Sequence, residues 1–231
     1  MSELWWANAF VGEAAGGNAT GVVIGGAPDE AAVARDLRAP DTVFVDGDAL
    51  RFYSPYEGRM AFCGQALLAA DAVLRARGHQ GPLRFTTDAG PASTRAHSGA
   101  SWFSTPRERS FLVEAGPHGA LVDSGRRRAF VRLGCAAEVD AVAVAPVEVL
   151  ARCASLGISG LCWYAVEADV VRLRVLTVSL LGEEDAATGG AVLGLAALLP
   201  PGRYVVEQGS GHRLRRGRLL LDAPAADVVE V

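Results

Sequence analysis

Two apolar helical segments, repeated at an offset of 125 residues, constrain most strongly what this chain can fold into. They are residues 64–77, "GQALLAADAVLRAR", and residues 189–199, "GGAVLGLAALL". When the two segments are aligned at this offset, five positions carry identical residues: Gly64 and Gly189, Ala66 and Ala191, Leu68 and Leu193, Ala72 and Ala197, and Leu74 and Leu199. Apolar residues occupy almost every face of both helices, which requires a surrounding sheet. Such self-similarity predicts two related lobes, each built around a central helix.

The remaining pattern predicts an α/β chain with α+β character. We expect a lobe of residues 1–108 and a lobe of residues 109–231, and leave open whether the last strand returns to the first lobe. Runs such as "TGVVIGG", "TVFVDG" and "GLCWYAVEADVVRLRVLT" are rich in β-branched and aromatic residues and predict strands. Further helices are expected at 29–38 and 147–157, and strand ends with a loop at 91–109.

Composition excludes several classes of function. All 22 basic residues are arginine, and the net charge of −4 offers no electrostatic footprint for nucleic acid. The basic runs at 126–128 and 213–218 predict solvated turns between strands. No stretch reaches the roughly 18 apolar residues of a membrane span, and "MSELWWANAF" lacks the features of an export signal, so we expect a cytoplasmic protein. The four cysteines, which show no CxxC spacing, predict neither a zinc site nor a disulfide framework.

Four blocks of sequence carry a resemblance to a known family. They are "NAFVGEAAGGNATGVVI", "FYSPYEGRMAFCGQALLAADAVL", "RVLTVSLLGEEDAATGGAVLGLAALL" and "EQG" at residue 207. In order and spacing they resemble the phenazine-biosynthesis PhzF-like family, which has the diaminopimelate epimerase-like fold. The resemblance implies two pseudo-symmetric lobes, each with a mixed or antiparallel sheet around its helix. It also implies a small carboxylate substrate in the cleft between them, proton transfer without a cofactor, and a homodimer.

Two acids are the candidate catalytic residues. Asp185 matches the acid of the family's Asp-Pro-Ala-Thr-Gly-Ser block, which implies proton transfer, although an aspartate near a helix start is also an ordinary cap. Asp41 falls where the family carries a catalytic glutamate, with Pro40 in place of a serine. Its carboxylate is one methylene shorter, and the alternative is a polar turn before the strand "TVFV". A partly desolvated acid would have a pKa suited to moving a proton.

Three further candidates match substrate-binding positions of the first lobe. Asn18 matches the family's Gly-Asn-Pro block, and a turn asparagine is the alternative. Gln65 replaces the family's histidine and cannot carry a proton at neutral pH. Cys63 stands at a helix start and could be one thiol of a two-cysteine epimerase. Its partner would sit near Ala187, which has no thiol, so a lone buried cysteine is the preferred interpretation and a racemase is disfavoured.

Backbone groups at the two helix starts complete the predicted site. Amide groups at a helix N-terminus bind carboxylates, and the glycines at 64, 189 and 190 would let a substrate approach closely. We therefore expect Gly64 in the first lobe, and Thr188, Gly189 and Gly190 in the second, to contact the substrate. Gly190 replaces a serine that often follows Thr-Gly in the family.

These residues predict an isomerase that moves a proton, and with it a double bond, within a small unsaturated amino or carboxylic acid. The resemblance implies antibiotic or other secondary metabolism, including pathways to alkylproline units. The alternative is a binding protein that retains the cleft without turnover, which the changes at Gln65, Gly190 and Asp41 favour. No metal, nucleic acid or membrane partner is expected.

Overall fold

The chain divides into two compact units that do not follow a single cut in the sequence. The computed structural model describes residues 2–11, 16–97, 99–106, 110–116, 119–209, 216–224 and 228–231. The first unit comprises Met1–Ala9 and Asn18–Ser104, and the second comprises Phe10–Gly17 and Thr105–Val231. Val11 forms a β-bridge with Gly217, which ties the excursion at residue 10 to the second unit. The expected boundary at 108 lies outside the described residues.

The sheet of the first unit is mixed and runs from β1 to β8. Strands β1 to β4 pair in sequence order, β4 also contacts β5 and β6, and β6, β7 and β8 follow as antiparallel neighbours. The pairs β2–β3 and β4–β6 are parallel. The strands are β1 (Glu3–Ala9), β2 (Asn18–Ile24), β3 (Asp41–Asp46), β4 (Ala49–Ser54), β5 (Gly58–Met60), β6 (Leu83–Thr87), β7 (Gly90–His97) and β8 (Ala100–Pro106).

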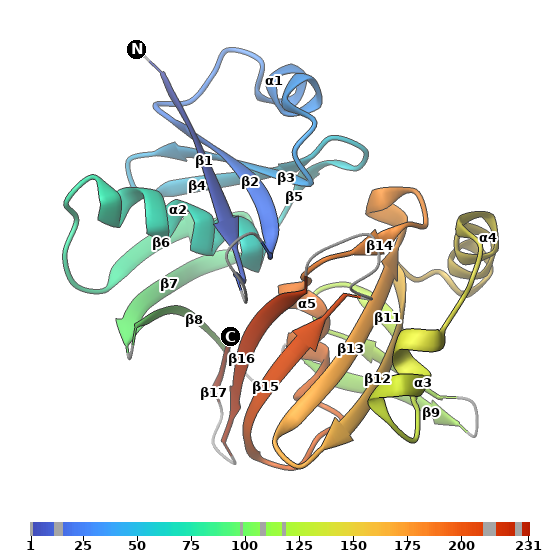
Figure 1. Ribbon diagram of the computed structural model, residues 1–231. Helices are drawn as coiled ribbons and strands as arrows, with labels where there is room; N and C mark the ends of the chain where they lie inside the picture. Colours follow the sequence, from blue (N-terminus) through green and yellow to red (C-terminus); the bar gives the residue numbers. More distant parts are fainter. Residues whose placement is uncertain are drawn as a thin grey trace. The chain divides into compact units, whose positions relative to one another are not determined.

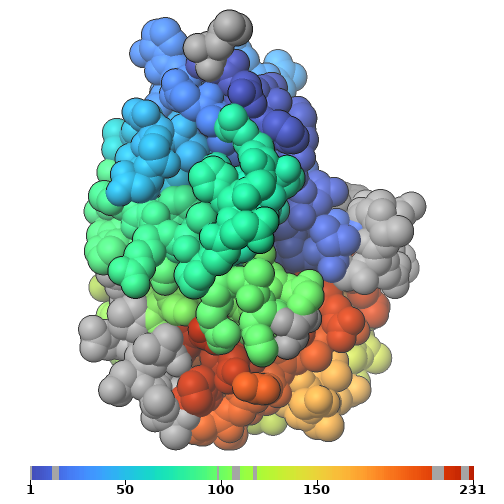
Figure 2. Space-filling model, turned by 90° about the vertical axis from the view of Figure 1, so that its left-hand side faces the viewer, coloured from blue at the N-terminus to red at the C-terminus, as the bar shows by residue number. Residues whose placement is uncertain are grey.

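Two helices cover opposite faces of this sheet, as Figure 1 shows. Helix α1 (Glu30–Leu37) begins at Asp29, whose carboxylate accepts the Ala32 N–H at 2.9 Å, and packs on Val23 and Phe44. Successive side chains of a strand point to opposite faces of the sheet, so the sheet has a second face. Helix α2 (Gly64–Ala76) packs on that face. It is buried along most of its length, as its apolar pattern predicts. The stretch that follows it, residues 77–82, is exposed and appears blue-green at the surface in Figure 2.

The second unit repeats this plan with different lengths. Its sheet runs β9-β10-β11-β12-β13, with β14 and β15 both against β13, and then β16 and β17. The pairs β11–β12 and β13–β15 are parallel, as β2–β3 and β4–β6 are in the first unit. The strands are β9 (Phe111–Gly116), β10 (Gly119–Asp123), β11 (Arg127–Arg132), β12 (Gly160–Glu167), β13 (Val170–Thr177), β14 (Glu184–Asp185), β15 (Gly202–Gln208), β16 (Gly217–Ala223) and β17 (Val228–Glu230).

Helices of the second unit also lie on both faces of their sheet. Helices α3 (Ala136–Ala141) and α4 (Pro146–Leu156) connect β11 to β12, and a 3₁₀ turn η2 (Val178–Leu180) and α5 (Gly189–Leu195) lie between β13 and β15. A β-carbon at Gly194 would lie 2.7 Å from Phe130 Cζ, so α5 packs tightly on the face that carries Phe130. Helix α4 packs on the other face through Val149 and Cys153. No described helix combines the length and apolarity that crossing a bilayer requires.

Three expectations about local structure are wrong, and a fourth lies partly outside the described residues. Residues 91–97 and 100–106 do not form strand ends with a loop, because β7 and β8 make an antiparallel hairpin there, and residues 107–109 lie outside the described ranges. Helix α5 ends at Leu195, short of the expected Leu199. Hydrogen bonds of 3₁₀ type, together with one from the Leu199 N–H to the Leu195 carbonyl at 2.9 Å, carry the turn on to Leu199. Arg127 and Arg128 belong to β11, and Arg128 is buried rather than solvated. In the second basic run, residues 213–215 lie outside the described ranges, whereas Arg218 is in β16.

Candidate active site

The first unit brings four of the expected residues together where β2, β3 and α2 begin. Asn18 and Asp41 start β2 and β3, and the parallel register places Asp41 beside Thr20. Cys63 precedes the first residue of α2, and its thiol donates to Asp41 Oδ2 at 3.3 Å. The first unit therefore assembles a polar cluster at the start of α2.

Gln65 is a structural link within this cluster. It is 4% exposed, and its amide nitrogen donates to Thr20 Oγ1 at 2.9 Å and to the Ala19 carbonyl at 3.3 Å. Its oxygen accepts from Asn18 Nδ2 at 3.0 Å. Both ends of the amide thus bind protein groups, and the side chain ties β2 to α2.

Cys63 differs from what the sequence predicts, and Gly64 has a packing role that the sequence did not reveal. Cys63 is half-buried rather than buried, and it makes no side-chain hydrogen bond that caps α2. A β-carbon at Gly64 would lie 2.5 Å from Phe103 Cζ. Close packing of β8 on the helix start therefore requires glycine at this position, whatever its role toward a substrate.

The second unit holds Asp185 in a defined orientation. Asp185 is 8% exposed and lies on β14 opposite Val175 of β13. Its Oδ2 accepts the Thr188 hydroxyl at 2.6 Å, and its Oδ1 accepts the Ala187 N–H at 3.3 Å. The residue that caps α5 is Thr188, with an extended backbone and no side-chain capping bond. The capping alternative for Asp185 is therefore wrong: its carboxylate fixes the turn before the helix.

Gln208, which sequence reasoning did not single out, fastens this turn from behind. It is fully buried, donates to the Asp185 carbonyl at 2.7 Å and to Thr188 Oγ1 at 2.9 Å, and accepts the Thr188 N–H at 2.9 Å. The only sequence signal was its place in the "EQG" block. The sequence predicts that the Thr188 N–H donates a hydrogen bond to a substrate. In the structure this N–H donates to Gln208 instead.

A buried ion pair supports the strand end that carries Gln208. Arg172 is 4% exposed, and its Nε donates to Asp140 Oδ1 at 2.7 Å. The same guanidinium binds the carbonyl oxygens of Glu207, at 3.0 Å, and of Gly209. Arg172 therefore holds the backbone on both sides of Gln208.

Arg128 is a second residue of this unit that the sequence did not reveal. It is 6% exposed, and a β-carbon at Gly190 would lie 3.1 Å from its Nη1 and 3.2 Å from its Nη2. Burial raises the pKa of the neighbouring Cys162 thiol to about 12, an effect that the Arg128 charge opposes and the Asp185 charge adds to. The charges of Arg128 and Asp185 therefore both influence the buried Cys162 thiol, in opposite directions. The sequence predicts a solvated basic run here because Arg128 follows Arg127, which is exposed.

Comparison with solved structures identifies this architecture. A PhzC/PhzF-type phenazine-biosynthesis protein of Clostridium difficile matches with a TM-score of 0.80 at 20% identity, over 100% of this chain and 94% of that one. A PhzF-family protein of Enterococcus faecalis matches with a TM-score of 0.79 at 21% identity, with the same coverage. The chain has the PhzF fold. A Pseudomonas aeruginosa protein described as a predicted epimerase matches with a TM-score of 0.70 at 19% identity, over 98% of this chain and 93% of that one. No family model and no curated protein matches the sequence.

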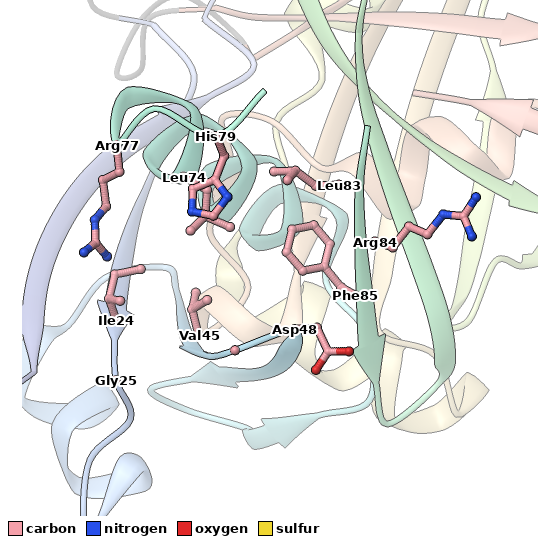
Figure 3. A pocket seen from close by; sticks show the side chains of 11 residues that line it. Ile24, Gly25, Val45, Asp48, Leu74, Arg77, His79, Leu83, Arg84 and Phe85 are labelled. Atoms are coloured by element: carbon pink, nitrogen blue, oxygen red, sulfur yellow. The ribbon is translucent and has the colours of Figure 1, made fainter. Parts of the chain in front are cut away.

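Two hollows of this PhzF fold lie away from the clusters described above. One of about 500 Å³ lies in the first unit at the C-terminal end of α2, beside Leu74, His79 and Phe85 (Figure 3). Another of about 400 Å³ lies in the second unit on the α4 side of the sheet, beside Leu156 and Trp163. Neither is lined by a predicted site residue. Within the described ranges, no group of three or more histidine, cysteine or acidic residues could hold a metal ion.

Proposed function

We propose that this protein is a PhzF-like isomerase that moves a proton, and with it a double bond, within a small unsaturated amino or carboxylic acid. The observation that carries the proposal is the Asp185 carboxylate, which is nearly buried and is oriented by Thr188 and the Ala187 N–H. A fixed carboxylate with few water neighbours suits a group that takes a proton from carbon and returns it to another carbon. The solved proteins of the same fold include PhzF-family members and a predicted epimerase.

In this proposal Asp185 is the principal acid/base. Its carboxylate removes a proton from a carbon next to the substrate's double bond, the electron pair shifts to move that bond, and the proton returns at the far carbon. The reaction has no net change in protons or electrons and needs no redox partner. Asp41 is proposed as the second carboxylate, with Cys63 as its hydrogen-bond neighbour. The assignment to secondary metabolism, including alkylproline-type precursors, and the homodimer belong to the same proposal.

A second candidate function is binding without turnover. It is favoured by Gln65, which stands at the position of the family's histidine. Both the oxygen and the nitrogen of its amide form hydrogen bonds with protein groups. In that case the chain would bind a small carboxylate and exchange no protons with it.

A two-thiol racemase is disfavoured by the environment of the cysteines. Burial raises the pKa of both the Cys153 and the Cys162 thiols, so neither supplies a thiolate near neutral pH. The Cys63 thiol donates to Asp41. We predict that Cys63→Ser retains most of the activity, because its hydroxyl can make the same hydrogen bond. Loss of all turnover in a folded Cys63→Ser protein would instead support the racemase.

The experiment compares Asp185→Asn with Glu184→Gln, a matched change at the adjacent residue of β14. Glu184 pairs with Arg174 at 3.3 Å. A panel of small unsaturated carboxylic and amino acids is incubated with each protein in heavy water, and NMR follows C–H to C–D exchange and double-bond movement. Asp185→Asn should exchange about 10²- to 10⁴-fold more slowly than the wild type. Glu184→Gln should stay within a few-fold of it.

The outcomes separate the two candidate functions. An Asp185→Asn protein that exchanges protons at the wild-type rate would remove Asp185 from the mechanism. A wild-type protein that binds members of the panel but exchanges none of their protons would establish the binding protein instead. Melting temperatures recorded on the same samples show whether a slow variant is merely unfolded.

A further inference from the structure

The sheet of the second unit extends beyond the helix that covers one of its faces. Helix α4 packs on β12 and β13 through Val149 and Cys153. Strand β9 adds to this sheet beyond β10, whereas β1, the counterpart of β10, pairs only with β2 in the described part of the first unit. The hollow of about 400 Å³ described above lies here, and residues of α4, β9, β10, β11 and β12 line it.

Apolar side chains form the floor of this hollow. Leu121, Ala129 and Leu161 are paired across β10, β11 and β12, and Val131 is paired with Trp163 next to them. Leu161 belongs to the core cluster under α4, and Leu121, Ala129 and Trp163 pack against that cluster. All five residues line the hollow. Its volume lies within the range of small-molecule sites, and its floor suits the apolar part of a ligand.

Two glycines lie where β9 and β10 border the hollow. Gly116 and Gly119 are paired across these strands. Gly119 has a φ of +137°, and a β-carbon there would collide with the Phe130 carbonyl oxygen, so this position requires glycine. Gly116 is not among the residues with a positive φ, and a β-carbon there would have no atom of the described residues within 4 Å. Gly116 therefore leaves open a space that a side chain could fill, as glycines in strands do where a ligand approaches closely.

Opposite charges stand on two sides of the hollow. Arg152 lies on α4, one turn before Leu156, and Glu114 lies on β9. Both charged residues are exposed, and within the described ranges no ion pair joins them. A guanidinium binds a carboxylate with two parallel hydrogen bonds, and a carboxylate binds an ammonium group. A ligand that carries both a carboxylate and an ammonium group therefore matches both sides, whereas a simple acid would be repelled by Glu114 and a simple amine by Arg152.

We propose that this hollow binds a free amino acid with an apolar side chain, in its zwitterionic form. The apolar side chain packs on the floor beside Trp163, the carboxylate binds Arg152, and the ammonium group binds Glu114. Cys162 lies in the same row across the sheet as Asp185, whereas Trp163, the next residue of β12, points to the opposite face. The site is therefore separate from the candidate acid, and the inference does not depend on the proposed isomerase.

The experiment titrates three ligands with the same phenylethyl body into the full chain and follows binding by NMR. L-phenylalanine carries both charges, 3-phenylpropanoate carries only the carboxylate, and phenethylamine carries only the ammonium group. The wild type should bind L-phenylalanine at least about fivefold more tightly than either analogue. Gly116→Leu, which fills the hollow, should abolish this binding. Its melting temperature should not fall, because leucine suits a strand better than glycine.

Variants of the two charged residues test each half of the zwitterion. Arg152→Gln should weaken L-phenylalanine binding about fivefold without weakening that of phenethylamine. Glu114→Gln should weaken L-phenylalanine binding to a similar extent without weakening that of 3-phenylpropanoate. Arg132→Gln is the matched control, because Arg132 is an exposed residue of β11 that does not line the hollow. This control and Asp185→Asn should both bind L-phenylalanine as the wild type does.

Four results would overturn the inference. One is a wild type that binds L-phenylalanine no more tightly than the two analogues, and another is a folded Gly116→Leu protein that binds it as the wild type does. Binding lost in Asp185→Asn but kept in Gly116→Leu would place the amino acid at the candidate active site. A wild-type dimer in size-exclusion chromatography that Gly116→Leu dissociates would show that a second copy of the chain occupies the hollow. If Gly116→Leu does not fold, the Arg152→Gln and Glu114→Gln titrations carry the test.

Discussion

Replacing Gln208 by leucine tests whether one buried amide holds the turn that carries the candidate acid. Gln208 makes three hydrogen bonds, of 2.7, 2.9 and 2.9 Å, to the Asp185 carbonyl and to the hydroxyl and N–H of Thr188. Each is worth about 1 kcal/mol net, and a buried group left without a partner costs roughly 1–3 kcal/mol more. Leucine has a similar volume but makes none of these three hydrogen bonds, and it leaves the Thr188 N–H without its Gln208 acceptor. The free energy of unfolding should fall by about 3–5 kcal/mol.

The measurement is urea denaturation followed by circular dichroism, at fixed pH and salt. Gln80→Leu is the control, because Gln80 is exposed and its replacement should change the free energy of unfolding by less than about 0.5 kcal/mol. At neutral pH Gln208→Glu should lower the free energy of unfolding at least as much as Gln208→Leu, since a buried carboxylate can accept the Thr188 N–H but places an unpaired negative charge against the Asp185 carbonyl. A loss below about 1 kcal/mol for Gln208→Leu would refute the reasoning, because it would mean that the turn holds without its three bonds.

Two further changes address stability in each unit. Burial keeps the Cys162 thiol protonated in the folded state up to about pH 12, whereas the thiol of the unfolded chain ionises from about pH 9.0. The free energy of unfolding should therefore fall by about 1.4 kcal/mol per pH unit over this range. Urea titrations at several pH values should show a flatter slope for Cys162→Ala. Asp71 is fully buried on α2 and binds Arg75 at 2.8 Å and also Thr94. Asp71→Asn should therefore lower the free energy of unfolding by about 3 kcal/mol, whereas Asp48→Asn, at an exposed position, should not change it. Equal values for the two variants would contradict this prediction.

Periodicity predicted the elements whose burial follows from their own residues. The apolar pattern of α2 and the β-branched runs of β12 and β13 need no knowledge of their neighbours, and both are where the sequence places them. The hairpin of β7 and β8 was missed because Ser, Gly and Pro dominate its composition, while its pairing comes from tertiary contacts. Helix α5 stops short because 3₁₀-type bonds replace its last turn, which residue composition does not reveal.

The candidate site shows the same division between local and long-range information. Motifs marked Asp185 and Asp41 as candidates, and Asn18, Cys63 and Gln65 as possible substrate contacts, but the hydrogen bond from Asn18 to Gln65 was not predicted. Arg128 was missed because a strand alternates its faces, so a buried arginine beside exposed ones looks like a basic run. Gln208 was missed because its role depends on three partners about 20 residues away, which no local pattern encodes.

The early excursion of the chain into the second unit has a consequence for its synthesis. The Phe10 carbonyl accepts the Arg218 N–H at 2.9 Å, and Val11 bridges Gly217. These contacts close a loop of about two hundred residues, and such long-range closure slows folding. Strands β1 and β2 can pair soon after they leave the ribosome, but Phe10 and Val11 must wait until Gly217 and Arg218 have been translated. During that interval these two residues are the place where we expect chaperones and proteases to act first on the nascent protein.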